Sequence, residues 1–444
     1  MNRSVIAVAA GIFAATSQYA AEVRHLTLTE AVHLAISQNH ALKIARLKVA
    51  EGQQAKAGQR SGYFPSLKNE STLLHVTELE RLGIPAGAFG TAGGSLVPAQ
   101  NTSLPQGQTT LYTSGTQLSQ PLTQLIRIRD ANRIAAADIA ISQDDLKKAE
   151  DEIALQVHSV YYGILIAKLQ KQAAEQQTQF ANQSLSENED DVRNGNALQV
   201  ATIQGRATVL ESQQAVLTAD LQLTDLTTEL NDLLGLPLET QLDLDASVPS
   251  TFDQRSREEY VQTAWSQNPQ IKAAESIVVK TRAAVGAAKA AYIPDVTAIA
   301  RQSYQYGIPF FVRNFGTFGA IMTWDVFDFG KRRAALRERQ DQLAEAEENV
   351  RRLKDEIAVS IQRSYDKLQR TKSMVEVAQQ VVKLRQESER LAQNQLAQGE
   401  VLVSARRQAT AASYKAQADW LQANLGYLLA WAELQESAGI TPGF

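Results

Sequence analysis

Two stretches of the chain decide its fold. Residues 38–67 read QNHALKIARLKVAEGQQAKAGQRSGYFPSL, and residues 267–296 read QNPQIKAAESIVVKTRAAVGAAKAAYIPDV. Both open with Gln-Asn, and both carry Tyr-x-Pro near their end, at an offset of 229 residues (292 − 63) without a gap. Self-similarity over this length indicates a duplicated chain.

A second block repeats at a different offset. The tetrapeptide DEIA at residues 151–154 returns at residues 355–358, and this shift of 204 (355 − 151) also relates Gly195 to Gly399. The two offsets differ by 25 residues (229 − 204), so the first copy contains an insertion. It falls in residues 77–108, where frequent Gly and Pro predict a long loop.

Each copy reads as a helix, two strands around a loop, a long helix, a turn and a further helix. The long helices are predicted near residues 127–194 and 331–398, where no proline interrupts them. Leu343, Val350 and Ile357 recur every seven residues in the second, as in a coiled-coil seam. At about 1.5 Å per residue, each long helix spans roughly 100 Å.

Shorter helices complete each copy, and they set the predicted boundaries. In the first copy we expect an opening helix over 35–62 and a helix after the turn over 199–234. The first repeat is assigned to residues 22–237, an inter-repeat linker to 238–256, and the second repeat to 257–444. The fold class is therefore mostly α with a small β part, built from a duplicated helix-strand-strand-helix-helix unit.

Four strands are predicted, near residues 65–76, 109–122, 295–306 and 316–327. In the last, Phe318, Met322 and Trp324 alternate with polar or small residues, so one face suits lipid and the other water. Four strands cannot close a barrel, and open edges are not stable in lipid. Copies would therefore share a barrel of 8, 12 or more strands. A soluble hairpin with one core face is the alternative.

The N-terminus predicts export from the cytoplasm. Residues 1–21 combine a basic start, a short apolar run and small residues, as a secretory signal peptide does. The cleavage point is ambiguous, and an ordinary N-terminal helix is the alternative. No later stretch approaches 18 consecutive apolar residues, so strands would have to carry any membrane insertion.

Composition and motifs argue against several other classes. The formal net charge of −4 disfavours a nucleic-acid binder, which needs a basic excess. The absence of cysteine excludes disulfides and the acylated cysteine of a lipoprotein, so no lipid anchor is expected. The five histidines lack ligand spacing, and no nucleophile, metal or phosphate motif occurs. We therefore expect no catalysis, no metal and no cofactor.

In this order and spacing, the motifs resemble those of TolC-type outer-membrane efflux proteins, the outer membrane factors. The resemblance rests on the duplication, on the YFP and YIP tripeptides at residues 63–65 and 292–294, on VFDFGK at 326–331, and on Gly195 and Gly399. It implies a homotrimer with a helical α-barrel tunnel in the periplasm. It also implies a 12-stranded β-barrel in the outer membrane of a Gram-negative bacterium.

The resemblance also implies partners and a function. The duct would be the passive exit of a tripartite efflux or type I secretion system. It would dock through its helical tips to a periplasmic adaptor (a membrane fusion protein) and to an inner-membrane RND, ABC or MFS transporter. A non-channel periplasmic coiled-coil scaffold or adaptor is the alternative function. The exported substrate and the particular adaptor and pump stay open.

The implied docking tips and tunnel mouth can be located by residue. The tips would present Gly195, Leu198, Gly399 and Leu402, although a plain helix connection explains these residues equally well. Some family members ring the closed mouth with aspartates, and the matching positions here are Ala405 and Gln408. The partner positions near the first tip, Val200 and Ala201, are not polar either. Cation binding at the mouth is therefore not expected, and how the mouth closes stays open.

Two arginines lie beside this mouth. Arg406 and Arg407 follow the second tip within two helical turns. They would either form a ring of guanidinium groups in a trimer or point outward to solvent or to the adaptor.

Overall fold

The structure, a computed structural model of the 444-residue chain, describes residues 24–245, 255–308 and 312–442. The expected signal peptide, residues 1–21, lies outside the described residues, as does the 246–254 part of the expected linker. The chain divides into two compact units. The helical unit comprises the residues up to 46, 145–269 and 354 onward, and the sheet unit comprises 47–144 and 270–353.

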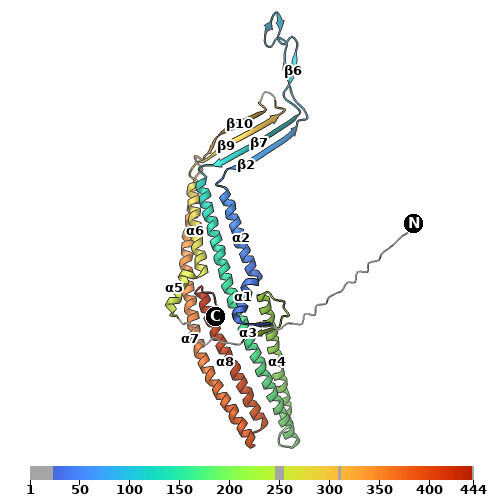
Figure 1. Cartoon of the computed structure of the whole chain (residues 1–444), viewed down its shortest axis with the longest axis vertical. Helices are drawn as coiled ribbons and strands as arrows, with labels where there is room; N and C mark the ends of the chain where they lie inside the picture. The colour runs from blue at the N-terminus through green and yellow to red at the C-terminus, as the bar shows by residue number, and fades with distance from the viewer. Residues whose placement is uncertain (1–23, 246–254, 309–311, 443–444) are drawn as a thin grey trace, which may run out of the picture. The chain divides into compact units, whose positions relative to one another are not determined.

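The order of elements repeats once along the chain, as the sequence predicts (Figure 1). The first copy contains β1 (Arg24–Leu26), α1 (Leu28–Gln38), α2 (His40–Ser61), β2 (Ser66–His75), β3 (Arg81–Ile84), β4 (Thr91–Ala92), β5 (Ser95–Leu96), β6 (Thr102–Pro105), β7 (Thr110–Pro121), α3 (Leu125–Arg193) and α4 (Gln199–Leu234). Strand β8 (Leu242–Leu244) follows within the expected linker. The second copy contains α5 (Arg257–Gln267), α6 (Pro269–Ala290), β9 (Asp295–Tyr306), β10 (Asn314–Thr323), α7 (Lys331–Gln398) and α8 (Val403–Ser437).

The opening helix of each copy is divided in two, which corrects the single helix expected over 35–62. Asn39 ends α1 with an extended ψ of 130°, and its Oδ1 accepts hydrogen bonds from the backbone N–H of Ala41 (2.9 Å) and Leu42 (3.4 Å). The same side chain thus begins α2. Asn268 ends α5 with a similar ψ of 123°, directly before α6 begins at Pro269. The repeated Gln-Asn pair is therefore the signal for a helix break.

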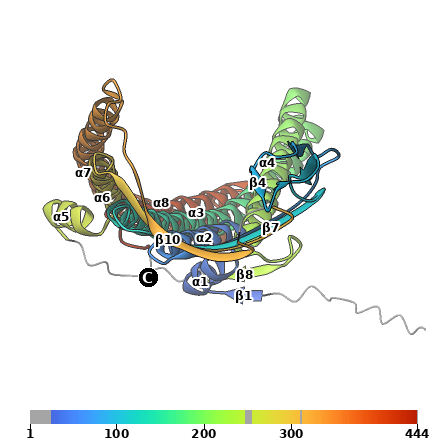
Figure 2. The ribbon, with the colours of Figure 1, turned by 90° about the horizontal axis from the view of Figure 1, so that it is seen from above.

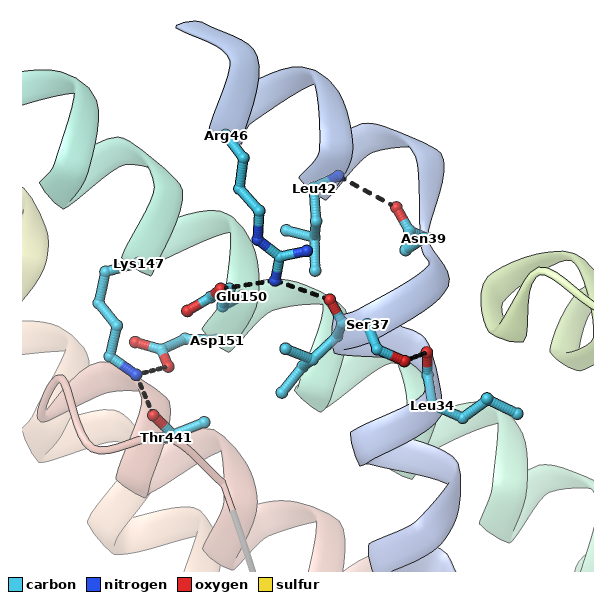
Figure 3. A network of polar contacts seen from close by, with 10 residues as sticks. Leu34, Ser37, Asn39, Leu42, Arg46, Lys147, Glu150, Asp151 and Thr441 are labelled. Atoms are coloured by element: carbon cyan, nitrogen blue, oxygen red, sulfur yellow. Dashed lines mark hydrogen bonds and ion pairs between the residues drawn. The ribbon is translucent and has the colours of Figure 1, made fainter. Parts of the chain in front are cut away.

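Polar contacts around this break hold α2 on the long helix α3 (Figure 3). Arg46 of α2 donates to the Ile36 carbonyl (2.8 Å) and to the Glu150 carboxylate of α3 (3.2 Å). One helical turn away, Lys147 donates to Asp151 (2.9 Å) and to Thr441 near the end of the second copy. The two copies are thus joined on α3 within the helical unit.

The longest helices of the helical unit lie in a row in the order α7, α8, α3, α4 (Figures 1 and 2). Lys367 of α7 bonds Glu433 of α8 (2.6 Å), and Gln170 of α3 bonds Gln422 of α8 (3.4 Å). On the other side of α3, Lys171 bonds Asp220 of α4 (2.5 Å). Helices α7 and α4 therefore form the two ends of the row.

The core of the helical unit lies where α1, α3, α4 and α8 meet. Its fully buried side chains include Val157, Tyr161, Leu230, Leu234, Leu425 and Leu428. The Tyr161 hydroxyl donates to the carbonyls of Leu26 (3.0 Å) and Asp245 (2.8 Å). Leu26 is the last residue of β1 and Asp245 directly follows β8, so the hydroxyl binds the end of the parallel pair β1–β8, which was not predicted from the sequence.

The sheet unit contains one antiparallel four-stranded sheet in the order β10-β9-β7-β2, which Figure 2 shows to be curved. Strand β10 was predicted over 316–327 but ends at Thr323, which pairs with Asp295, the first residue of β9. Beyond Thr323 the described part of the chain offers β10 no partner strand, because Pro294 precedes β9 and cannot donate to a ladder. The predicted 77–108 loop contains two small hairpins, β3–β6 and β4–β5.

The VFDFGK segment connects β10 to α7. Asp328 accepts hydrogen bonds from the backbone N–H groups of Gly330 (3.1 Å) and Arg332 (3.0 Å) and from the Arg332 side chain (2.6 Å). A carboxylate that binds the first free N–H groups of a helix stabilises its start. The motif therefore fixes where the long helix begins.

Candidate functional site

Each long helix ends in the same glycine turn. Gly195 and Gly399 have φ of +76° and +75°, in the left-handed region that favours glycine. The N–H of Asn196 bonds the Asp191 carbonyl (2.8 Å), and that of Glu400 bonds the Gln395 carbonyl (2.9 Å). This pattern is a Schellman C-cap, in which the residue after glycine bonds back across the last turn.

A leucine begins the helix after each turn. Leu198 and Leu402 are the N-cap residues of α4 and α8, with extended backbones and exposed fractions of 77% and 64%. Neither side chain caps its helix by a hydrogen bond. Each turn therefore presents an apolar side chain on its surface within the single chain.

The predicted mouth residues lie just beyond these turns. Ala201, Ala405 and Arg406 are half-buried, whereas Gln408 is exposed. Arg407 is half-buried, and its guanidinium donates to Gln179 of α3 (2.9 Å). Nearby, the Ser404 N–H donates to Glu187 of α3 (2.8 Å). Arg407 therefore reaches the neighbouring helix of its own chain, a contact that the sequence analysis did not anticipate.

The sheet has two chemically different faces. Register and alternation put Leu67, Leu118, Ala300, Phe318 and Met322 on one face. Lys68, Glu70, Gln117, Arg301 and Thr317 lie on the other. Phe318 and Met322 thus share the apolar face expected of them, whereas Trp324 lies beyond the end of β10.

The charged face of the sheet was not predicted from the sequence. Lys68 and Glu70 occupy even positions of β2 and lie on the polar face with Arg301, whereas His75 is at an odd position and lies on the face of Leu67. The alternation within β2 contains this signal. It could be interpreted only once the register with β7 and β9 was known.

Two exposed apolar stripes at the ends of the helical row were also missed. On α4, Ile203, Leu210 and Leu217 recur every seven residues, and all are more than 60% exposed. On α7, Val377, Leu384 and Leu391 show the same spacing and are also exposed. Exposed heptads of this kind are typical of helices that pack against a further helix.

Other kinds of site are not evident in the part of the chain that the structure describes. Within 24–245, 255–308 and 312–442, no group of His, Asp and Glu could hold a metal ion. None of the helices described has an apolar stretch long enough to cross a membrane.

Comparison with known proteins identifies the family. The model of the outer membrane efflux protein family matches residues 31–236 and 260–440, which include both copies of the repeat. The chain belongs to the outer membrane efflux protein family. The search of the curated proteins gave no match.

Solved outer-membrane channels have the same fold. The Campylobacter jejuni CmeC channel is 15% identical with a TM-score of 0.75, over 94% of this chain and 87% of that one. Vibrio cholerae VceC is 16% identical with a TM-score of 0.71, over 94% and 97%. The Neisseria gonorrhoeae MtrE channel is 18% identical with a TM-score of 0.65, over 94% and 89%. At these identities the likeness concerns the fold, and the TolC-type fold expected from the sequence is confirmed.

Proposed function

We propose that three copies of this chain form a passive exit duct across the outer membrane and periplasm of a Gram-negative bacterium. Family membership supports a role in outer-membrane efflux. The observation that carries the proposal is that the four-stranded sheet and the row of helices both end in unpaired edges. Among the described strands, β2 and β10 each have a partner on one side only, and α4 and α7 end the helical row.

A closed ring of several copies would pair the free strand edges and cover the helices at the ends of the row. Joining β2 of one copy to β10 of the next pairs the free N–H and C=O groups of the strands, as a lipid environment requires. Three copies then give a barrel of about twelve strands, large enough to enclose a lumen. The apolar face with Phe318 and Met322 would contact lipid, and the charged face would line the lumen.

The exposed apolar stripes on α4 and α7 would provide the contact between the helices of neighbouring copies. Met374, Val377 and Val381 of α7 line an open groove beside Ala416 and Ala423 of α8. The small alanines leave room for a third helix, and the heptad on α4 has the complementary spacing. We assign this groove to α4 of the neighbouring copy.

A fractionation and conductance experiment separates the duct from a soluble scaffold. The duct should remain in the outer-membrane fraction until detergent is added, and the extracted oligomer should give discrete current steps in a planar bilayer. Release with the periplasmic fraction and no current from the folded protein would support a coiled-coil scaffold instead.

The glycine turns fit the role of docking tips in a tripartite efflux or type I secretion system. Their leucines are exposed at the free ends of helix pairs, where an adaptor helix could pack against them. The double variant Leu198→Ser, Leu402→Ser should reduce copurification of the native adaptor and its RND, ABC or MFS transporter, with oligomerisation unchanged. Equal adaptor recovery from both proteins would place docking elsewhere.

The mouth arginines allow a second test of the assembly. In a ring, Arg406 from three copies would favour anions, and Arg406→Ala with Arg407→Ala should move the reversal potential toward cations at low salt. Arg407 already contacts Gln179, so Arg406 is the better candidate for the lumen. An unchanged reversal potential in the double variant would assign both side chains to outward positions.

A further inference from the structure

All the formally charged side chains of the four strands lie on one face of the sheet. Strands β2, β7, β9 and β10 contain four such residues, namely Lys68, Glu70, Asp295 and Arg301. Lys68 is opposite Gln117, which is opposite Arg301, so these side chains form one row across the sheet. Glu70 and Asp295 lie an even number of residues from Lys68 and Arg301, and thus on the same face.

The charges on this face do not cancel near the row. Asp295 lies at the start of β9, six residues from Arg301, and is ion-paired with Arg127. Lys68 Nζ lies 2.6 Å from the Glu70 carboxylate. With one negative and two positive side chains around the row, each copy carries one excess positive charge there.

Gly115 leaves room for the Arg301 guanidinium. A Cβ atom at Gly115 would lie 2.5 Å from Nη2 and 2.7 Å from Nε of Arg301, which is closer than side chains can approach. The guanidinium therefore lies against the bare backbone of β7. Because Gly115 is opposite Glu70 in the register, this position also brings Arg301 toward the Lys68–Glu70 pair, and its charge acts on Glu70.

We propose that Lys68, Glu70 and Arg301 form a positively charged band in the lumen of the sheet region, where it favours anions over cations. The inference rests on the proposed function, since only a closed assembly turns this face toward an enclosed aqueous lumen. In lipid, arginine and lysine side chains are strongly disfavoured, which assigns the charged face to the lumen. Three copies would bring three excess positive charges to the same level of the duct.

Reversal potentials in planar bilayers under a dilute salt gradient test the band. One unit charge about 10 Å from a permeating ion in water changes its Boltzmann weight about twofold. Arg301→Gln should therefore lower the anion-to-cation permeability ratio about twofold or more, and Glu70→Gln should raise it. Arg301→Lys is the matched control, because it keeps the charge and should keep the ratio.

Salt concentration gives an independent readout. The differences between the variants should shrink in 1 M salt, where the screening length is about 3 Å. Opposite shifts in Arg301→Gln and Glu70→Gln that shrink at high salt support the band. Equal ratios in wild type and both variants, measured on channels that conduct, overturn the band and leave the duct standing. An assembled wild-type oligomer without conductance overturns the duct and the band together.

Discussion

At the scale of the residue, Gly399 and Gly439 have the same backbone geometry but different surroundings. Both have φ of +75°. Apart from its own chain neighbours, no described residue has an atom within 4 Å of a Cβ atom built on Gly399, whereas one on Gly439 would lie 2.4 Å from Cα and 2.7 Å from the backbone N of Asn268. The left-handed conformation alone costs a non-glycine residue about 1 kcal/mol. The clash at Gly439 adds a packing cost of about 1–3 kcal/mol.

We therefore expect Gly399→Ala to lower the melting temperature of the helical circular-dichroism signal slightly. Gly439→Ala should lower it several-fold more, because the backbone of Asn268 cannot move aside as a side-chain end can. Gly195→Ala, also without a neighbour within 4 Å, should behave like Gly399→Ala. An equal decrease in melting temperature for Gly399→Ala and Gly439→Ala would mean that the helix break at Asn268 does not constrain Gly439.

The helical unit also contains a buried titratable ring. His158 of α3 is fully buried and packs edge-on against Tyr162, with ring centroids 6.0 Å apart. Burial lowers the pKa of the His158 imidazole from 6.5 to about 4, because the charged form loses its hydration. Between these two values the unfolded chain binds a proton that the folded chain does not.

The free energy of unfolding should therefore fall as the pH drops from about 6.5 to about 4. His158 contributes up to about 3 kcal/mol to this fall, and its contribution is complete above pH 7. His158→Leu removes the titrating group, so thermal unfolding of the variant should depend less on pH in this window. Identical pH dependence of the two melting temperatures would show that His158 is not responsible.

At the scale of the element, the sequence predicted the long helices better than the strands. The bounds of α3 and α7 agree with the predictions to within two residues, because heptad spacing and the absence of proline are local signals. The end of β10 was predicted too late in the chain. Trp324 and Val326 continue the alternation of the sequence, but β9 no longer offers them a partner. The β1–β8 pair was not predicted, because each strand has only three residues and is too short to show an alternating pattern.

The heptad stripe on α4 gives the clearest prediction at this scale. Leu210→Glu with Leu217→Glu should dissociate the oligomer in mild detergent, because six carboxylates would enter three helix contacts. Gln222→Glu lies on the same helix, is also exposed and adds charge about 120° around the helix from Leu210, outside the stripe, so it should leave the oligomer intact. Native gel electrophoresis would measure both. Intact oligomers in the double variant would exclude α4 from the contact between copies.

At the scale of the whole molecule, duplication was the decisive sequence signal, and it gave the order of elements in both copies. The position of the charged face could not be predicted in the same way. It depends on the register of β2, β7 and β9, which come from distant parts of the chain. The stripes on α4 and α7 likewise became informative only when the row of helices placed both at its ends.

The number of chains in the detergent-extracted particle tests the proposed closure between copies most directly. Light scattering coupled to size exclusion, with the mass of the bound detergent subtracted, would measure the protein mass of the purified particle. A duct that joins β2 to β10 and α4 to α7 between neighbours predicts a single species of three chains. A monodisperse single chain with its strand and helix content intact would contradict closure between copies, and with it the exit duct.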